Sequence, residues 1–232
     1  MKKYLLFLSA AILFNAGNDS KNNTDLDNLE YSHYDIQLKI IPDEQFIKVT
    51  GNLKFLVMED SLNELSFNLH KKLEISDFSI NGDHSYQLDT SKTNVRWLPD
   101  AMKIIYPTKK KFYKGDIVNI EFSYQGRITE WPDWSANVIG ADWIEIGLYF
   151  PWYPSINGLF TYKVSVDIAP DFNVFAIGKS TERDNKKVFE TEFTVYDFII
   201  FLLLVNPQKR TIRRFLKPNF QFMILSFVHQ RI

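Results

Sequence analysis

Apolar and polar residues alternate along much of this chain, and that period of two constrains the fold more than any other feature. In the segment YDIQLKI (residues 34–40) every second residue is apolar, and a second alternating run covers residues 46–57. Successive side chains of a β-strand point to opposite faces, so such runs predict strands with one buried face. The turn residues PDE at 42–44 lie between the two runs, and the pair is therefore predicted to be a hairpin.

Similar short runs predict further strands as far as Val205. Turn signals separate some of them, namely NGD at 81–83 and KGD at 114–116. The predicted strands are 64–69, 73–80, 85–89, 94–98, 103–106, 117–124, 143–148, 160–168, 173–177, 187–192 and 196–205. Within the last range, FIIFLLLV (198–205) is continuously apolar, which favours a strand buried on both faces. Helical periodicity with capping residues is absent, so we expect an all-β fold, an antiparallel β-sandwich of many short strands.

The first 16 residues are typical of a signal peptide. Lys2 and Lys3 precede an apolar stretch from Tyr4 to Phe14, which is shorter than the roughly 20 residues that span a bilayer. Cleavage after Ala16 would leave an exported chain, located in the periplasm, at the cell surface or outside the cell. A buried N-terminal strand and a retained signal anchor are the alternatives. Residues 17–30 are rich in Asn, Asp and Ser and are predicted to form a flexible linker.

Residues 206–232 depart from this pattern, because they are basic and apolar without alternation. We interpret them as a tail of uncertain structure that follows a truncation or a frameshift. A final helix or strand, or a membrane-surface segment, is the alternative.

Charge and cysteine content exclude several classes of function. The formal net charge is −1, whereas a nucleic-acid-binding domain needs a concentrated basic face. The chain has no cysteine, so disulfides, thiolate zinc sites and cysteine nucleophiles are excluded. Hydrophobic residues make up 45% of the chain, enough for a core that stabilises the domain without such cross-links.

Three segments in order, over residues 31–204, resemble the N-terminal domain of aminopeptidase-N-type zinc metallopeptidases. They are YDIQLKIIPDEQFIKVTGNLKFLV, YPTKKKFYKGDIVNIEFSYQGRI, and WIEIGLYFPWYPSI followed by FTYKVSVDIAPDFNVFAIGKS. The resemblance implies a saddle-like β domain, here residues 31–205, that sits over a thermolysin-like catalytic domain.

In that family the zinc ligands belong to an HExxH helix of the catalytic domain, with a more distant Glu. The four histidines of this chain are His33, His70, His84 and His229, and none is followed by Glu. The two histidines and the intervening Glu of HExxH must share a helix face to bind zinc and act as base. The chain alone is therefore predicted to be inactive and to hold no metal or other cofactor. Zinc would come only with a catalytic domain supplied elsewhere.

The resemblance also implies a substrate-binding role for one side chain. In the family, the N-terminal domain offers an amide or acidic group to the free amine of the substrate, roughly ten residues before an aromatic-Pro segment. Glu145 and Asp142 lie nearest that place, although the usual Gln-x-Gln or Gln-x-Glu context is missing, and FPWYP (150–154) lacks the usual acid. The alternative is that both are solvated charges beside a strand.

Aromatic residues concentrate at 131–153 and support a second hypothesis. A stand-alone secreted β-sandwich could bind carbohydrate or protein through exposed rings, whereas core packing is the competing interpretation. The candidate surface rings are Trp131, Trp134, Trp152 and Tyr153. Coplanar rings facing solvent would favour sugar binding.

The acids of this region allow a third hypothesis, a glycosidase. Its carboxylates would be Glu130 with Asp133, or Asp142 with Glu145, but such pairs must face each other across a cleft, which sequence proximity does not establish.

The sequence thus predicts a non-catalytic domain that docks on a missing or separate metallopeptidase domain and shapes its substrate cleft. Its peptide substrate would be bound only together with that partner. Membrane contact is predicted only through the signal segment or the basic and apolar tail.

Overall fold

The computed structural model describes residues 32–57, 59–91, 98, 100–147, 149–155, 159–191, 195–196 and 202–205. Over this part of the chain the fold is almost entirely β, with a single 3-10 turn, η1 (Pro42–Glu44), and no α-helix. The predicted all-β class is confirmed. The predicted signal peptide, linker and tail lie outside the described residues, as does most of the strand predicted at 94–98.

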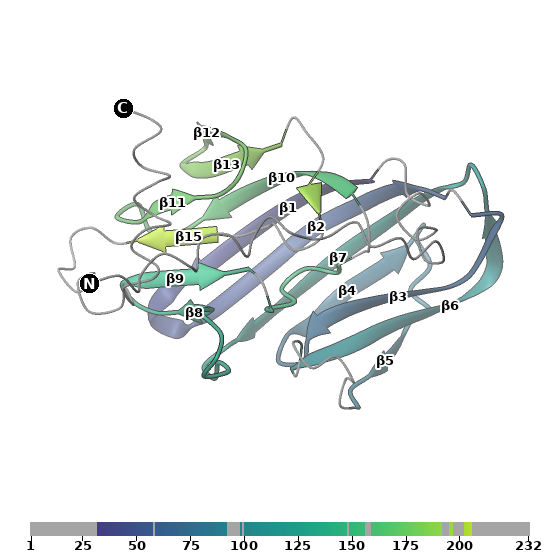
Figure 1. Ribbon diagram of the computed structural model, residues 1–232, viewed down its shortest axis with the longest axis horizontal. Coiled ribbons are helices and arrows are strands. Elements are labelled where there is room, and N and C mark those ends of the chain that lie inside the picture. Colours follow the sequence, from purple (N-terminus) through teal and green to yellow (C-terminus); the bar gives the residue numbers. More distant parts are fainter. Residues whose placement is uncertain are drawn as a thin grey trace, which may run out of the picture.

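Three sheets make up the domain (Figure 1). The large sheet has eight strands in the order β12-β13-β10-β1-β2-β7-β4, with β14 paired to β10 outside this row. Its strands are β1 (Ser32–Ile41), β2 (Phe46–Leu56), β4 (Glu74–Ile80), β7 (Ile117–Arg127), β10 (Leu159–Asp167), β12 (Lys179–Arg183), β13 (Lys186–Glu190) and β14 (Val195–Tyr196).

Two smaller sheets complete the structure. The four-stranded sheet has the order β11-β15-β9-β8, and the three-stranded sheet has the order β3-β6-β5. Their strands are β8 (Val138–Ile139), β9 (Trp143–Ile146), β11 (Asn173–Phe175) and β15 (Leu202–Val205), and then β3 (Ser61–His70), β5 (Gln87–Asp89) and β6 (Ala101–Tyr113).

Both small sheets pack against the same inner face of the large sheet. Along β1, β2, β7 and β10 alternate residues are buried, and they share one core with Ile144 of β9. At the other end, the ring of Phe67 on β3 lies 5.9 Å from that of Phe78 on β4. The two smaller sheets therefore form the second layer of the predicted sandwich.

One strand pair departs from the antiparallel expectation. Strands β1 and β10 are parallel, with Tyr34 opposite Tyr162. More than a hundred residues separate these partners, so no local hairpin signal could reveal the pairing. Strand β12 was not predicted either, because its sequence, KSTER, lacks alternation and lies exposed at the edge of the sheet.

The segment that follows β9 crosses the inner face of the large sheet. The hydroxyl of Tyr34 donates to the carbonyl of Pro154, and that of Tyr124 donates to the carbonyl of Trp152, both at 2.8 Å. The backbone N–H of His70 at the end of β3 donates to the carbonyl of Pro151 at 2.8 Å. Residues 149–155, which follow β9, are thus bonded to both the large sheet and the three-stranded sheet.

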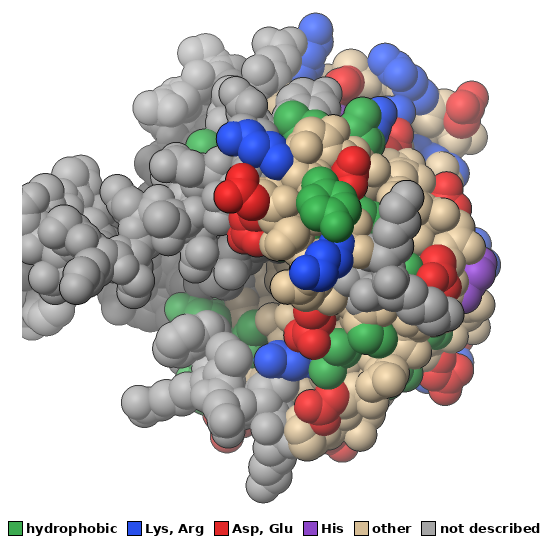
Figure 2. Space-filling view, turned by 90° about the vertical axis from the view of Figure 1, so that its right-hand side faces the viewer, with side chains coloured by type: hydrophobic (Ala, Val, Ile, Leu, Met, Phe, Trp, Pro, Cys, Tyr) green, Lys and Arg blue, Asp and Glu red, His purple; other side chains and the backbone are tan. Residues whose placement is uncertain are grey.

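The surface carries charges of both signs. Figure 2 shows basic and acidic side chains interspersed over the described part of one end of the molecule. This mixture agrees with the near-zero net charge and not with a phosphate-binding face.

Candidate functional site

Glu145 lies on the outer face of the four-stranded sheet. Its neighbours in β9, Ile144 and Ile146, are fully buried against the core, so strand alternation turns Glu145 to the opposite side. In register it lies between Val138 of β8 and Leu203 of β15. Glu145 is nevertheless only 6% exposed, which is unusual for a carboxylate.

This burial changes the ionisation of the carboxylate. Burial raises the pKa of Glu145 to about 7, and a side-chain hydrogen bond from Trp143 opposes the rise. A buried acid without a cationic partner is costly to keep ionised, and such groups concentrate at functional sites. Near neutral pH Glu145 can therefore be charged or neutral, and a cation placed beside it would favour the charged form.

An amide holds the end of β9 in place. The side-chain oxygen of Asn137 accepts a hydrogen bond from the backbone N–H of Gly147 at 2.9 Å. Its side-chain nitrogen donates to the hydroxyl of Ser135 at 2.7 Å. Asn137 is 6% exposed, so these bonds are shielded from water. Asn137 carries no signal of this role in the sequence, because its Ser-Ala-Asn context is typical only of a turn.

Asp142, the second acid that the resemblance implied, lies in the turn between β8 and β9. It is partly buried, and a backbone hydrogen bond of 2.9 Å from Gly140 to Trp143 closes the turn around it. Of the two acids, Glu145 is the one that lies in a strand and is almost enclosed.

The four candidate surface aromatics do not form one surface. Trp152 is 0% exposed and Tyr153 is 6% exposed, so the assignment of these two rings to the surface was wrong: they are core residues. Trp131 is partly buried and packs edge-on against Phe150, with 4.9 Å between ring centroids.

Only Trp134 among the four is well exposed, and its ring lies at 75° to that of Tyr149. Perpendicular rings do not offer the coplanar platform that sugar stacking requires.

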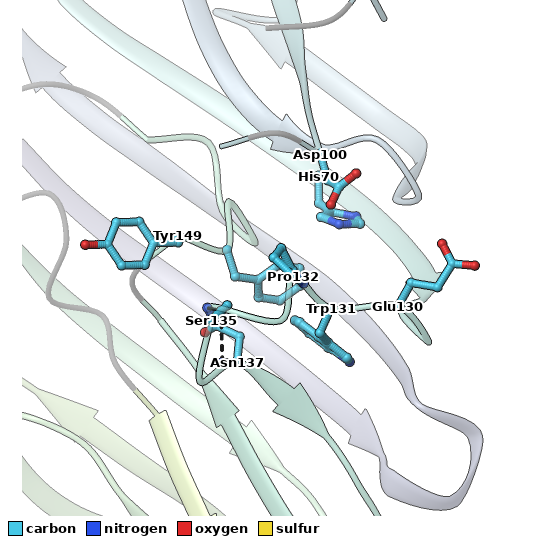
Figure 3. A pocket seen from close by; sticks show the side chains of 9 residues that line it. His70, Asp100, Glu130, Trp131, Pro132, Ser135, Asn137 and Tyr149 are labelled. Carbon is cyan, nitrogen blue, oxygen red and sulfur yellow. Dashed lines mark hydrogen bonds between the residues drawn. The ribbon is translucent and has the colours of Figure 1, made fainter. Parts of the chain in front are cut away.

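A small cavity lies beside these rings (Figure 3). Its volume is about 10 Å³, enough for one water molecule and no larger ligand. It is lined by His70, Asp100, Glu130, Trp131, Pro132, Ser135, Asn137, Tyr149 and Phe150. In Figure 3, His70 and Asp100 lie above the other labelled residues, whereas Glu130 and Trp131 lie below this pair.

Two lining side chains of this cavity have structural partners. Burial lowers the pKa of His70 to about 4, and its ring packs edge-on against Phe150. Glu130, a candidate glycosidase acid, forms an ion pair with Lys72 at 3.0 Å. Asp133, its suggested partner, lies exposed in the loop before β8.

Within the described residues, no group of three or more His, Asp or Glu side chains could hold a metal ion. Among the same residues, no helix is long and apolar enough to cross a membrane.

Comparisons with known proteins support the fold. No protein-family model matches the sequence, and no curated protein sequence does so either. The M1 zinc metallopeptidase of Deinococcus radiodurans has a similar structure, with a TM-score of 0.53 and 18% identity over 77% of this chain. The native yeast LTA4 hydrolase is similar over the same share, with a TM-score of 0.56 and 12% identity.

This chain spans less than half of those proteins, 42% of the bacterial enzyme and 29% of the yeast enzyme. The fold thus resembles the N-terminal domain of M1 metallopeptidases, as the sequence segments predicted.

Proposed function

We propose that this chain is an exported, non-catalytic β domain that docks on a metallopeptidase catalytic domain. In this role it shapes the end of the substrate cleft that receives the amino group of a peptide. The single observation that supports this role most strongly is the nearly enclosed carboxylate of Glu145, whose pKa burial raises to about 7.

The chemistry of Glu145 suits an amine. A carboxylate forms short, charge-assisted hydrogen bonds with a protonated amine, and these bonds are stronger where water is excluded. Two structures of a mutant M1 zinc metallopeptidase of similar fold contain L-tryptophan and a Tyr-Ser-Ala substrate, both of which carry a free amino group. This agreement supports an amine as the ligand of Glu145.

The hydrolytic chemistry would belong to the assembly. The described residues lack a metal-binding group, so zinc and the general base would come from the metallopeptidase domain. The assembly would release N-terminal residues from peptides, and this chain would contribute substrate orientation. The signal-like residues 1–16 support the proposal that the chain is exported.

The stand-alone binding module receives no support from the aromatic residues. Two of its four candidate rings are buried, and the exposed Trp134 stands perpendicular to its neighbour.

Sequencing the encoding DNA from the codons of residue 198 downstream, in all three frames, tests the proposal. We expect a frame that encodes HExxH with a distant Glu. The encoded domain would then be produced together with this chain, and the two should copurify from a dilute mixture. Absence of such a frame, there and elsewhere in the genome, would exclude the peptidase assembly.

A further inference from the structure

His70, the last residue of β3, joins the three-stranded sheet to its surroundings. Its backbone N–H donates to the carbonyl of Pro151 at 2.8 Å, and its carbonyl accepts from the N–H of Leu73 at 3.0 Å, which closes the turn after β3. The ring packs edge-on against Phe150, with 5.3 Å between ring centroids, and only 4% of the residue is exposed. His70 therefore lies at a junction between β3, the turn that follows it and residues 149–155.

The ring takes part in this junction as a hydrogen-bond acceptor. The backbone N–H of Lys72 donates to Nδ1 of His70 at 3.3 Å. An imidazole nitrogen accepts a hydrogen bond only while it carries no proton, so this contact requires a neutral ring with its proton on Nε2. A proton on Nδ1 would place two N–H donors against each other and break the bond.

Four charged side chains surround the ring, and they form two ion pairs. Lys71 pairs with Asp100, and Lys72 pairs with Glu130 at 3.0 Å. Burial lowers the pKa of the ring to about 4; Asp100 opposes this shift, and the two lysines add to it. A charged ring would therefore be buried among acids that already have partners.

The opposite side of the junction is aromatic. Phe150 also packs edge-on against Trp131, with 4.9 Å between ring centroids, and Tyr149 lines the same small cavity (Figure 3). The ion pair between Lys72 and Glu130 attaches the loop that carries Trp131 to the turn after β3. Opening of this turn would therefore loosen the loop as well.

We propose that His70 is the centre of an acid-sensitive latch, meaning its contacts with Lys72, Phe150 and Pro151. At neutral pH the latch holds the turn after β3 against residues 149–155, and a proton on Nδ1 of the ring releases it. The inference does not depend on the proposed docking on a metallopeptidase domain, because every contact that it uses lies within this chain.

Amide hydrogen exchange of the full chain at pH 7 and at pH 3.5 tests the latch. The amides of His70 and Lys72 report its opening, and the amide of Val49, in the middle of β2, reports global unfolding. A ring pKa of about 4 in the closed state and 6.5 in the open state predicts a fall in protection of the two latch amides by about 200-fold, after correction for intrinsic exchange. Val49 should keep its protection.

His70→Asn separates the proton from the hydrogen bond. The Asn side-chain oxygen can accept the N–H of Lys72 in place of Nδ1, but the amide does not titrate. This variant should keep the protection of the Lys72 amide at pH 7 and lose most of its acid-induced fall. His84→Asn, at an exposed histidine, is the matched control and should behave as the wild type.

Two outcomes would overturn the latch. A fall of equal size in His70→Asn would assign it to protonation of Asp100 or Glu130, and a parallel loss at Val49 would mean that the whole chain unfolds. If His70→Asn does not fold, nitrogen-15 NMR of the wild-type ring decides. The ring should titrate together with the Lys72 amide at a midpoint near pH 4, and a midpoint near 6.5 would contradict the inference.

Discussion

The two outer faces of the sandwich differ in what surrounds their acids. On the large sheet, Asp35 of β1 forms an ion pair with Lys163 of β10 at 3.2 Å, and both side chains are about one-third exposed. On the four-stranded sheet, Glu145 is almost enclosed, and its described partner is the uncharged indole of Trp143.

This difference separates a solvated face from a candidate binding face. Polar residues at alternate positions of β1, β2 and β7 cover the outside of the large sheet, so that face can remain exposed to water. An enclosed acid on the small sheet reduces the stability of the isolated fold and is more readily explained by a ligand.

The largest expected effect contrasts a core ring with an exposed ring. Trp152 is fully buried below the small sheets, whereas Trp134 is 55% exposed. Trp152→Ala should lower the free energy of unfolding by about 3–5 kcal/mol, and Trp134→Ala by about 1 kcal/mol or less. Urea denaturation followed by circular dichroism measures both. Equal losses would contradict the assignment of Trp152 to the core.

A second prediction concerns His70, which should make the fold more stable as the pH rises. Burial lowers the pKa of His70 from 6.5 to about 4, so protonation opposes folding in this interval. Unfolding free energy should increase from pH 4 to pH 6.5 by up to about 3 kcal/mol. His70→Leu should remove most of that increase, and the same substitution at exposed His84 serves as control. An unchanged slope in His70→Leu would show that His70 is solvated.

The third prediction concerns Glu145, which should make the fold less stable as the pH rises. Because burial raises the pKa of Glu145 from 4.5 to about 7, folding favours the protonated carboxyl, and the resulting loss of stability grows across this interval. Glu145→Gln should therefore leave the free energy of unfolding unchanged below pH 4.5 and raise it by about 2–3 kcal/mol above pH 7.

Glu121→Gln on the exposed face of β7 is the matched control and should change stability by less than about 0.5 kcal/mol. If Glu145→Gln behaves like this control at every pH, the two outer faces do not differ as described.

The smallest effect is expected at the ion pair of the large sheet. Lys163→Met should lower the unfolding free energy by less than about 1 kcal/mol, since both partners of this pair reach solvent. The loss should shrink further at about 1 M salt, where screening acts over a few ångströms. A loss above about 2 kcal/mol, measured by the same denaturation, would mean that this face is also enclosed.

Much of the fold could be predicted because alternation is a local property. The runs at 34–40 and 46–57 became β1 and β2, paired as the predicted hairpin. The parallel pairing of β1 with β10 could not be predicted, since it joins residues far apart in the chain and depends on the packing of the whole sheet.

The candidate site could be predicted from the sequence only in part. Resemblance pointed to Glu145 and Asp142 together, and only the structure distinguishes the enclosed acid from the acid in the turn. The aromatic cluster was misleading, because ring-rich sequences look alike whether the rings pack inward or outward. Trp152 and Tyr153 pack inward because residues 149–155 cross the core, a path set by hydrogen bonds from distant tyrosines.

Kinetics of the reconstituted assembly would test the central claim most directly. The metallopeptidase domain, once found, is assayed with leucine p-nitroanilide alone, with this chain, and with its Glu145→Ala and Glu121→Ala variants. Loss of a charge-assisted hydrogen bond of about 1.5–3 kcal/mol should lower kcat/KM by about 10- to 150-fold in Glu145→Ala, with Glu121→Ala unchanged. A catalytic domain equally active without this chain, or with Glu145→Ala, would contradict the account.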